Sequence, residues 1–257
     1  MSDARPQDAP TRTDDVVAVI LAGGLGTRIR HLLPDIPKPM APVADRPCLE
    51  WLVRYLVKQQ ISRVVISTGY RTEVIEKHFA TNPVAGAQVC CTAEPEPLGT
   101  AGGLLHAIKN CGQTARAWLV LNGDTFVFAE LAQALDALRE PSTSGVICTQ
   151  QVADASRYGT VVSDAKGNLA KFEEKRPGPG AINTGLYLFR DKLVKSFPDR
   201  TPLSLERDVF PALTAKGVSL KVLPVLAPFL DIGTPESLPE ADAFVRSHLS
   251  AFALPKV

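Results

Sequence analysis

Short apolar runs alternate with amphipathic segments through the first half of the chain. The apolar runs are rich in β-branched residues and have the length of strands; they cover residues 16–21, 63–68, 87–92 and 117–121. Between them, apolar residues recur at helical spacing over residues 49–60, 72–80, 100–109 and 128–140. Strands that alternate with helices predict an α/β fold with a mostly parallel central sheet and helices on both faces.

The second half has a different rhythm, because several strands follow one another before the next helix. We expect strands at residues 145–150, 159–163, 169–174 and 182–189, and helices at residues 205–216 and 235–249. A turn at residues 164–168 and a Pro-Gly loop at residues 177–180 separate these strands. The sheet should therefore be mixed in this half. We expect a single domain over residues 16–257, preceded by a polar, disordered tail at residues 1–15.

Composition and charge narrow the classes of partner. The chain has 257 residues, with 28 Lys and Arg against 27 Asp and Glu, and no basic run that would favour nucleic acid or an anionic membrane. Its five cysteines do not form paired C-x-x-C motifs, which argues against a zinc site and a disulfide framework. We see no signal peptide and no apolar run long enough to span a membrane. We therefore expect a soluble, cytoplasmic protein.

A glycine-rich loop, Leu21-Ala-Gly-Gly-Leu-Gly-Thr-Arg28, follows the first strand. Glycines let backbone N–H groups close on an anion, and an arginine fork matches phosphate oxygens. The spacing fits neither the Walker A loop nor G-x-G-x-x-G. Lys38 lies downstream between two prolines, on backbone that is rigid. The pattern favours a phosphate-binding loop, although a purely structural strand-to-helix turn can have the same composition.

Two aspartates follow predicted strands. Asn122-Gly-Asp124 follows the strand at residues 117–121, and Asp231 follows an apolar run at residues 227–230. Ligands of parallel sheets bind at the carboxyl ends of strands, where carboxylates can hold Mg²⁺. An ordinary turn or helix-cap aspartate is the alternative for each. Together with the glycine-rich loop, the pair predicts a site for a metal and a nucleotide.

Glu94 and Gly99 lie in a Pro-rich loop after the third strand. A fixed carboxylate that faces a base can accept hydrogen bonds from N1–H and the exocyclic amino group of guanine. Adenine lacks that N1–H, and an unpaired group in such a pocket costs roughly 1–3 kcal/mol. If Glu94 faces the base, guanine is therefore favoured; a solvent-exposed glutamate is the alternative.

Two segments of the second half have the composition of sugar-binding segments. Residues 156–160 and 182–186 contain groups that both donate and accept hydrogen bonds, among them the amide of Asn183. Lys175 closes a predicted strand and could reach a second phosphate. A solvated, charged strand end is the alternative for Lys175.

Taken in order, these segments resemble the sugar-1-phosphate nucleotidyltransferase family. The matching pieces are the glycine-rich loop and residues 37–39, 94–100, 122–124, 173–175, 183–185 and 231–233. Within the family, residues 35–43, 156–161, 172–175 and 204–208 resemble the D-glycero-α-D-manno-heptose 1-phosphate guanylyltransferases. The resemblance implies a Rossmann-like nucleotidyltransferase fold whose second half binds the sugar.

The resemblance also implies roles for individual residues. Arg28, Lys38 and Lys175 would be the catalytic cations, and Asp124 and Asp231 would hold Mg²⁺. The nucleotide would be bound by residues of the loop and of the following strand ends: Leu21, Ala22, Gly23, Gly24, Gly26, Thr27, Arg28, Glu94, Gly99, Thr100, Asn122 and Gly123. The sugar phosphate would be bound by residues of the second half: Gly159, Glu174, Lys175, Asn183, Thr184 and Glu206.

The reaction that the resemblance implies is in-line attack of a sugar 1-phosphate on the α-phosphorus of GTP. The products would be GDP-heptose, for a surface polysaccharide or glycan, and pyrophosphate. The attacking phosphate has a second pKa of about 6, so the reaction needs no general base. Mannose 1-phosphate, another sugar or another nucleotide remain alternatives, as does a non-catalytic sensor with the same fold. Family relatives form dimers or tetramers, which implies a homo-oligomer.

Overall fold

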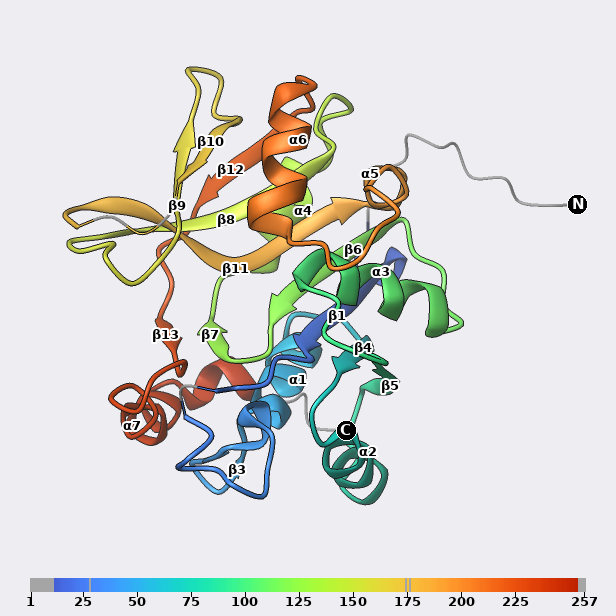
Figure 1. The fold of residues 1–257 in the computed structure, drawn as a ribbon, viewed down its shortest axis with the longest axis vertical. Helices are drawn as coiled ribbons and strands as arrows, with labels where there is room; N and C mark the ends of the chain where they lie inside the picture. Colours follow the sequence, from blue (N-terminus) through green and yellow to red (C-terminus); the bar gives the residue numbers. More distant parts are fainter. Residues whose placement is uncertain (1–11, 28, 174, 176, 254–257) are drawn as a thin grey trace, which may run out of the picture.

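The computed structural model describes residues 12–27, 29–173, 175 and 177–253. Four strands of its main sheet are parallel to one another: β1 (Val16–Ala22), β4 (Arg63–Thr68), β5 (Gln88–Ala93) and β6 (Ala117–Asn122). The other five come from the second half: β8 (Gly145–Val152), β9 (Thr160–Ser163), β10 (Leu169–Glu173), β11 (Gly180–Arg190) and β12 (Leu220–Pro224). The strand order is β10-β9-β11-β6-β1-β4-β5, with β8 paired to β11 and β12 paired to β8 (Figure 1).

Helices cover both faces of this sheet, because its buried strands are apolar on both sides. Val17 and Val19 of β1 pack with α3 (Thr100–Asn110), α5 (Asp191–Val194) and α6 (Phe210–Ala215). Ala18 and Ile20 belong to the opposite cluster, which has four helices: α1 (Cys48–Lys58), α2 (Thr72–Thr81), α4 (Leu131–Ala137) and α7 (Glu240–Ser247). The predicted α/β class with helices on both faces is therefore confirmed. The antiparallel pairing of β11 with β6, β8 and β9 makes the second half mixed, as predicted.

Several predicted boundaries were wrong. The helix predicted at residues 128–140 is the shorter α4, because β7 (Thr125–Val127) pairs with β13 (Phe229–Asp231) just before it. The segment 205–216 is divided into a π-helical turn, η3 (Leu205–Val209), and α6, whose first turn contains a proline. The helix predicted at residues 235–249 begins only at Glu240, because Thr234 and Ser237 form a side-chain-bonded turn ahead of it. Strand β12 was not predicted at all.

The chain ends and the short connections complete the description. Residues 1–11 and 254–257, and with them most of the predicted disordered tail, lie outside the described residues. The end of that tail is ordered, as the 3-10 helix η1 (Thr13–Asp15). The remaining short elements are η2 (Lys38–Met40), β2 (Pro42–Val43), β3 (Arg46–Pro47) and η4 (Leu249–Phe252). Within the described part of the chain, no helix has the length and apolarity that crossing a membrane requires.

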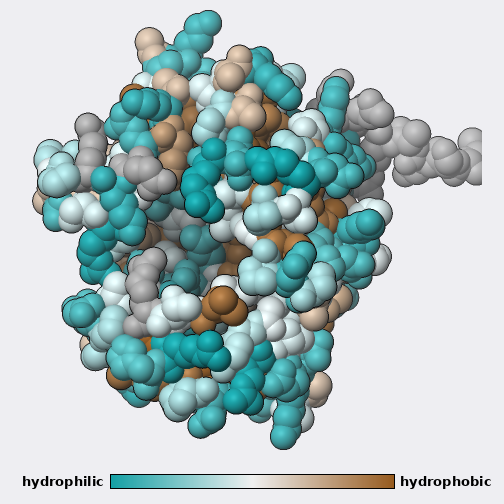
Figure 2. All heavy atoms as spheres, viewed as in Figure 1, coloured by the Kyte–Doolittle hydropathy of each residue, from teal (hydrophilic) through white to brown (hydrophobic). Residues whose placement is uncertain are grey.

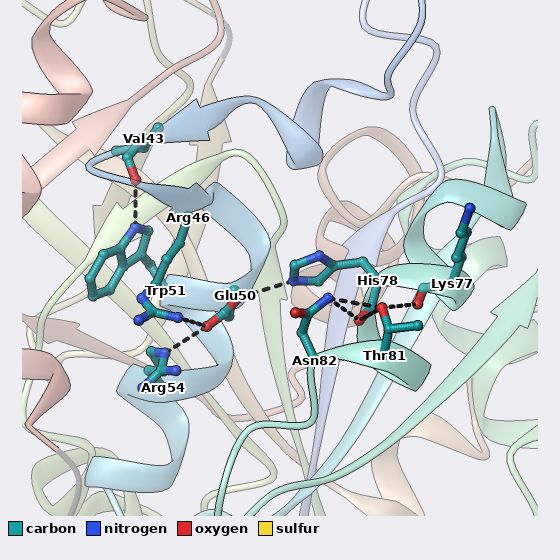
Figure 3. A network of polar contacts seen from close by, with 9 residues as sticks. All are labelled: Val43, Arg46, Glu50, Trp51, Arg54, Lys77, His78, Thr81 and Asn82. Atoms are coloured by element: carbon teal, nitrogen blue, oxygen red, sulfur yellow. Dashed lines mark hydrogen bonds and ion pairs between the residues drawn. The ribbon is translucent and has the colours of Figure 1, made fainter.

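A buried carboxylate ties α1 to its neighbours (Figure 3). Glu50 of α1 is 3% exposed and accepts from Arg46 over 2.7 Å and from Arg54 over 2.9 Å. His78 of α2 lies 3.0 Å from its other oxygen. Burial opposes ionisation of Glu50, but the bonds from Arg54, Arg46 and His78 outweigh it and lower the pKa of the carboxyl. The network therefore joins α1, α2 and the β2–β3 hairpin in a charge-compensated cluster, which we call the Glu50 cluster.

Candidate active site

The glycine-rich loop leaves β1 at the carboxyl ends of the parallel strands. A Cβ on Gly23 would lie 2.2 Å from Oε1 of Glu94, so a side chain at this position would displace that carboxylate. Farther along, the loop packs on Lys38, whose Cβ lies 3.0 Å from the position that a Cβ on Gly26 would take. Lys38 begins η2, between two buried prolines. The rigid backbone of this segment therefore holds the lysine under the loop.

A cavity of about 330 Å³ opens between this loop, the start of α3 and the end of β6. We call it the first cavity. Its lining combines residues predicted to bind the nucleotide with Lys38, Asp124 and two prolines: Leu21, Ala22, Gly23, Gly24, Gly26, Lys38, Pro39, Glu94, Pro97, Gly99, Thr100, Asn122 and Asp124. On the face drawn in Figure 2, the surface is hollowed between the part that carries β8 and β11 and the part that carries α7, and hydrophilic side chains lie in the hollow.

Glu94 lines the first cavity with both of its carboxylate oxygens already oriented. The hydroxyl of Ser67, which is fully buried on β4, donates to Oε1 over 2.9 Å. The backbone N–H of Leu98 donates to Oε2 over 3.2 Å. Each carboxylate oxygen has two acceptor positions, so a ligand can still donate to both oxygens. The carboxylate is thus fixed in direction and keeps acceptor capacity for a ligand.

Gly99 joins the Glu94 loop to α3, and its backbone contact brings in a distant segment. It has a φ of +79°, and a Cβ on it would lie 2.5 Å from the carbonyl oxygen of Leu203. That carbonyl accepts from the N–H groups of Ala101 and Gly102, over 2.9 and 3.0 Å. First-turn N–H groups have no partner within their own helix. The contact therefore satisfies the start of α3 and brings the segment that leads to η3 beside it.

Asp124 and Lys38 form an ion pair, with 2.5 Å between Nζ and Oδ2 and side chains that are 37% and 11% exposed. The backbone carbonyl of Asp124 accepts from the N–H of Ile232 over 3.0 Å, which brings Asp231 close. Burial, followed by repulsion from Asp124, raises the pKa of Asp231. Among the described residues, Lys38 is the cation that forms an ion pair with this pair of carboxylates. We call the three residues the Asp124 cluster.

A second cavity, of about 160 Å³, adjoins the first. The two share Asn122 and Asp124. The other lining residues come from the second half or from β7 and are mostly polar: Thr125, Tyr158, Asn183, Thr184, Phe229 and Asp231. Asp124 therefore lies where the two cavities meet, with Lys38 in the lining of the first and Asp231 in the lining of the second.

Asn183 lines the second cavity, and both ends of its side-chain amide have partners. Its Nδ2 donates to the hydroxyl of Tyr187 over 2.6 Å, and its Oδ1 accepts from the N–H of Gly185 over 3.2 Å. Its backbone N–H donates to the carbonyl of Gly159 over 2.9 Å. Thr184 is buried and donates to the carbonyl of Cys148 over 2.8 Å. Asn183 is thus held at both ends of its amide.

Some predicted site residues line neither cavity. Thr27 and Lys175 are exposed, and Gly123 is buried behind the loop, where its N–H donates to the carbonyl of Leu21 over 2.9 Å. The carbonyl of Gly159 accepts from the backbone N–H of Asn183, and the carboxylate of Glu206 accepts from the hydroxyl of Thr100. Arg28 and Glu174 lie outside the described residues.

Comparison with known proteins agrees with this arrangement. The Nucleotidyl transferase family matches residues 17–248. The chain belongs to this family. It is 36% identical to a D-glycero-α-D-manno-heptose 1-phosphate guanylyltransferase of Campylobacter jejuni, over 85% of this chain and 95% of that protein. It is also 36% identical to a mannose-1-phosphate guanylyltransferase of Mycobacterium tuberculosis, over 90% of this chain and 65% of that protein.

A solved structure has the same fold. The structure of HddC from Yersinia pseudotuberculosis, complexed with GMP-PN, matches with a TM-score of 0.77 and 32% identity, over 88% of this chain and 97% of that one. The Rossmann-like nucleotidyltransferase fold is therefore confirmed, and this protein is a nucleotidyltransferase.

The donor set of this nucleotidyltransferase fits a divalent metal that arrives with its substrate. Within the described residues, no group of three or more His, Cys, Asp or Glu side chains is arranged to hold a metal ion. Asp124 and Asp231 supply two carboxylates, and Mg²⁺ commonly takes one or two from the protein while phosphate oxygens and water complete its shell. Burial of Asp231, and after it the charge of Asp124, raises the pKa of Asp231, so a bound cation would favour its ionised form. These two residues are therefore suitable ligands for Mg²⁺ bound to a triphosphate.

Sequence reasoning missed residues that orient the nucleotidyltransferase site. Ser67 and Tyr187 read as ordinary strand residues, and only their polar contacts in the fold distinguish them. Tyr158 lies within a segment predicted to contact sugar, and its ring packs on Phe229 with centroids 5.5 Å apart. No sequence pattern identified Phe229 as a site residue, because its position depends on the pairing of β13 with β7.

Proposed function

We propose that this nucleotidyltransferase transfers a guanylyl group from GTP to D-glycero-α-D-manno-heptose 1-phosphate, and releases pyrophosphate. The observation that carries the proposal is the oriented carboxylate of Glu94 in the wall of the first cavity, held by Ser67 and Leu98. The similarity to guanylyltransferases over nearly the whole chain supports it.

Glu94 explains the choice of base. Guanine offers N1–H and the exocyclic amino group side by side, which a single carboxylate can accept as two hydrogen bonds. Adenine would place a ring nitrogen acceptor against the carboxylate, and uracil or thymine offers a single N–H. A buried acceptor without its partner costs roughly 1–3 kcal/mol. We therefore expect GTP to be preferred over ATP, UTP and dTTP by about tenfold to a hundredfold or more.

The residues around the cavity junction fit the phosphate chemistry. The attacking group is a phosphate monoester, largely dianionic near neutral pH because its second pKa is about 6, so it needs no general base. The obstacle is repulsion between two polyanions, which the protein lowers by positioning and neutralising charge. Lys38 would neutralise charge on the reacting phosphates, and Arg28 of the loop would bind the triphosphate. Mg²⁺, held by Asp124 and Asp231, would supply further charge neutralisation between the phosphates.

The second cavity would hold the sugar phosphate. Asn183 and Thr184 line it, and Lys175, which is exposed after β10, would hold the phosphate. Glu174 would contact hydroxyl groups of the sugar. Heptose 1-phosphate is the proposed substrate because the Campylobacter jejuni relative is similar over 95% of its length. Mannose 1-phosphate is the second candidate, since the Mycobacterium tuberculosis relative is equally identical. We further propose a cytoplasmic enzyme and a homo-oligomer, whose GDP-heptose product supplies a glycosyl transfer reaction.

The test is a matrix of substrates. Four nucleoside triphosphates are each combined with heptose 1-phosphate, mannose 1-phosphate and glucose 1-phosphate, and pyrophosphate release is measured with Mg²⁺ present. We expect the highest kcat/KM for GTP with heptose 1-phosphate. Faster turnover of UTP or dTTP than of GTP would refute the role of Glu94. Faster turnover of mannose 1-phosphate than of heptose 1-phosphate would change the proposed sugar substrate and leave the proposed reaction unchanged. The absence of turnover with every pair would instead favour a non-catalytic sensor.

A further inference from the structure

We propose that Tyr187 and Glu206 are positioning residues that fix the side chain of Asn183 for sugar binding. They also join it to Thr100 in the wall of the first cavity. The inference rests on the proposed function, because it assigns the second cavity to the sugar phosphate. Neither Tyr187 nor Glu206 lines a cavity itself, so each would act through a neighbour.

A directed chain of hydrogen bonds carries the inference. Asn183 Nδ2 donates to the hydroxyl oxygen of Tyr187 over 2.6 Å, and the Tyr187 hydroxyl donates to Oε1 of Glu206 over 3.4 Å. The other oxygen of Glu206 accepts from Thr100 Oγ1 over 2.9 Å and from Ser204 Oγ over 2.8 Å. The chain therefore runs from the second cavity to the first through residues of β11, η3 and α3.

The two ends of this chain of hydrogen bonds are fixed as well. Thr100 Oγ1 accepts from the backbone N–H of Leu205 over 2.8 Å while it donates to Glu206, so its hydroxyl has one orientation. Oδ1 of Asn183 accepts from the N–H of Gly185 over 3.2 Å. If the amide of Asn183 rotated by half a turn, its NH₂ group would face the N–H of Gly185, and its oxygen would compete with Glu206 for the proton of Tyr187. The network therefore decides which edge of the amide is an acceptor and which is a donor.

The hydroxyl of Tyr187 has no other evident purpose. The residue has no exposed surface, and its ring stacks on Phe189 with centroids 5.6 Å apart and planes at 13°. A phenylalanine would make the same ring contacts. Burial, followed by the charge of Glu206, raises the pKa of Tyr187, so the hydroxyl keeps its proton and donates. A buried hydroxyl usually requires a partner, and both partners here belong to the chain between the cavities.

This chain of hydrogen bonds gives Glu206 a role other than direct sugar binding. Its carboxylate accepts from three hydroxyl groups. The side chain of Thr100 links it to the first cavity, and the side chains of Tyr187 and Asn183 link it to the second. A sugar hydroxyl would donate to Oδ1 of Asn183 or accept from its second N–H, in the orientation that Tyr187 imposes. We therefore expect losses at Tyr187 to appear in sugar binding, although Tyr187 does not touch the sugar.

The first test compares Tyr187→Phe with Tyr55→Phe. Tyr55 is 1% exposed, donates its hydroxyl to the carbonyl of Ala129, and lines neither cavity, so it controls for the loss of a buried tyrosine hydrogen bond. We expect Tyr187→Phe to raise KM for the sugar 1-phosphate about fivefold to tenfold, with KM for GTP within twofold of the wild-type value. Tyr55→Phe should leave both constants unchanged. Equal sugar KM values in Tyr187→Phe and the wild type would overturn the proposal.

A double-mutant cycle separates positioning from a general structural effect. If Tyr187 acts through Asn183, adding Tyr187→Phe to Asn183→Ala should not change the sugar KM further. Additive effects of the two substitutions would contradict the proposal. So would a parallel rise of both KM values in Tyr187→Phe.

A third measurement does not depend on the identity of the substrates. The side-chain amide protons of Asn183 can be followed by NMR in the free protein, with the wild type and Tyr187→Phe compared. We expect slow exchange with water and a single orientation in the wild type, and faster exchange in Tyr187→Phe. If no substrate pair turned over but this difference were seen, the proposed function would fail while the positioning role stood. Identical amide signals in both proteins would overturn the positioning role.

Discussion

Two clusters of partly or fully buried charge differ in how well they are compensated. In the Glu50 cluster, one carboxylate meets Arg46, Arg54 and His78, and its pKa is lowered. In the Asp124 cluster, two carboxylates meet one ammonium, Lys38, and the pKa of Asp231 is raised. In the first cluster the cations outnumber the carboxylate, and in the second the carboxylates outnumber the cation that is ion-paired with them.

The difference indicates where a ligand belongs. A buried carboxylate with a full set of donors stabilises the contact between helices and needs nothing further. A pair of carboxylates that outnumbers its ion-paired cations favours the binding of a positively charged group, because that group supplies charge that the fold does not. The Asp124 cluster lies where the two cavities meet, and we propose that a metal bound with phosphates supplies positive charge there. We therefore expect removal of a carboxylate charge to lower the free energy of unfolding in the Glu50 cluster and to raise it in the Asp124 cluster.

The largest expected effect is on catalysis, from Asp124→Asn. This change removes the proposed metal ligand and the partner of Lys38, so we expect kcat to fall by about 10³-fold or more. The variant should still bind GTP weakly, because the loop and Glu94 are intact. Pyrophosphate release and equilibrium binding of GTP measure the two effects. A rate like that of the wild type would exclude Asp124 from the metal site.

The next effect is on stability, from Glu50→Gln. Loss of the carboxylate leaves Arg46 and Arg54 without their anion, so we expect the free energy of unfolding to fall by about 3 kcal/mol at pH 7. The lowered pKa of Glu50 means that its contribution is present above its unfolded value of about 4.3 and is lost as the pH falls through the folded value. Urea unfolding at pH 7 and at pH 3.5 measures this difference.

Glu50→Gln should leave kcat of the folded protein within twofold of the wild type. A loss of activity larger than the loss of folded protein would show that the Glu50 cluster also serves the site. A difference in stability that stayed constant down to pH 3.5 would contradict the role of its charge.

The smallest effect has the opposite sign, in the metal-free form of Asp231→Asn. Because the folded pKa of Asp231 is raised, the wild type loses stability as the pH rises through that value. An asparagine keeps the acceptor for Gly233 and has no charge. We therefore expect a gain of about 1 kcal/mol at pH 7 that disappears below about pH 4, together with loss of catalysis. Thermal unfolding in EDTA at both pH values measures it, and destabilisation at pH 7 would contradict the excess of negative charge.

Local sequence patterns predicted several elements that carry the two clusters, but not the contacts between residues far apart in the chain. Strand β1, the glycine-rich loop and the strand-end position of Asp124 were readable from sequence, because each depends on residues close together in the chain. The contacts of Asp124 with Ile232 and of Glu50 with His78 join residues far apart in the chain, so no local pattern contains them. Arg46 and Arg54, in contrast, each lie four residues from Glu50. Asp231 was identified from its turn and from family resemblance, whereas the β13–β7 pairing that places it became visible only in the fold.

The positioning residues were hidden for a different reason. Ser67 and Tyr187 lie inside apolar strands. From sequence alone, a hydroxyl residue in such a strand can be a packing residue or a functional one. Tyr187 becomes informative only when its hydroxyl is seen between Asn183 and Glu206. The helix predicted at residues 205–216 also obscured η3, the element that brings Glu206 to Thr100.

The central claim, that the site transfers a guanylyl group, is tested most directly by a ratio of specificity constants. With heptose 1-phosphate at a fixed concentration and Mg²⁺ in excess, kcat/KM is measured for GTP and for UTP. We predict a ratio of at least about tenfold in favour of GTP, falling toward one in Glu94→Ala. A ratio of one or less in the wild-type protein would contradict the account.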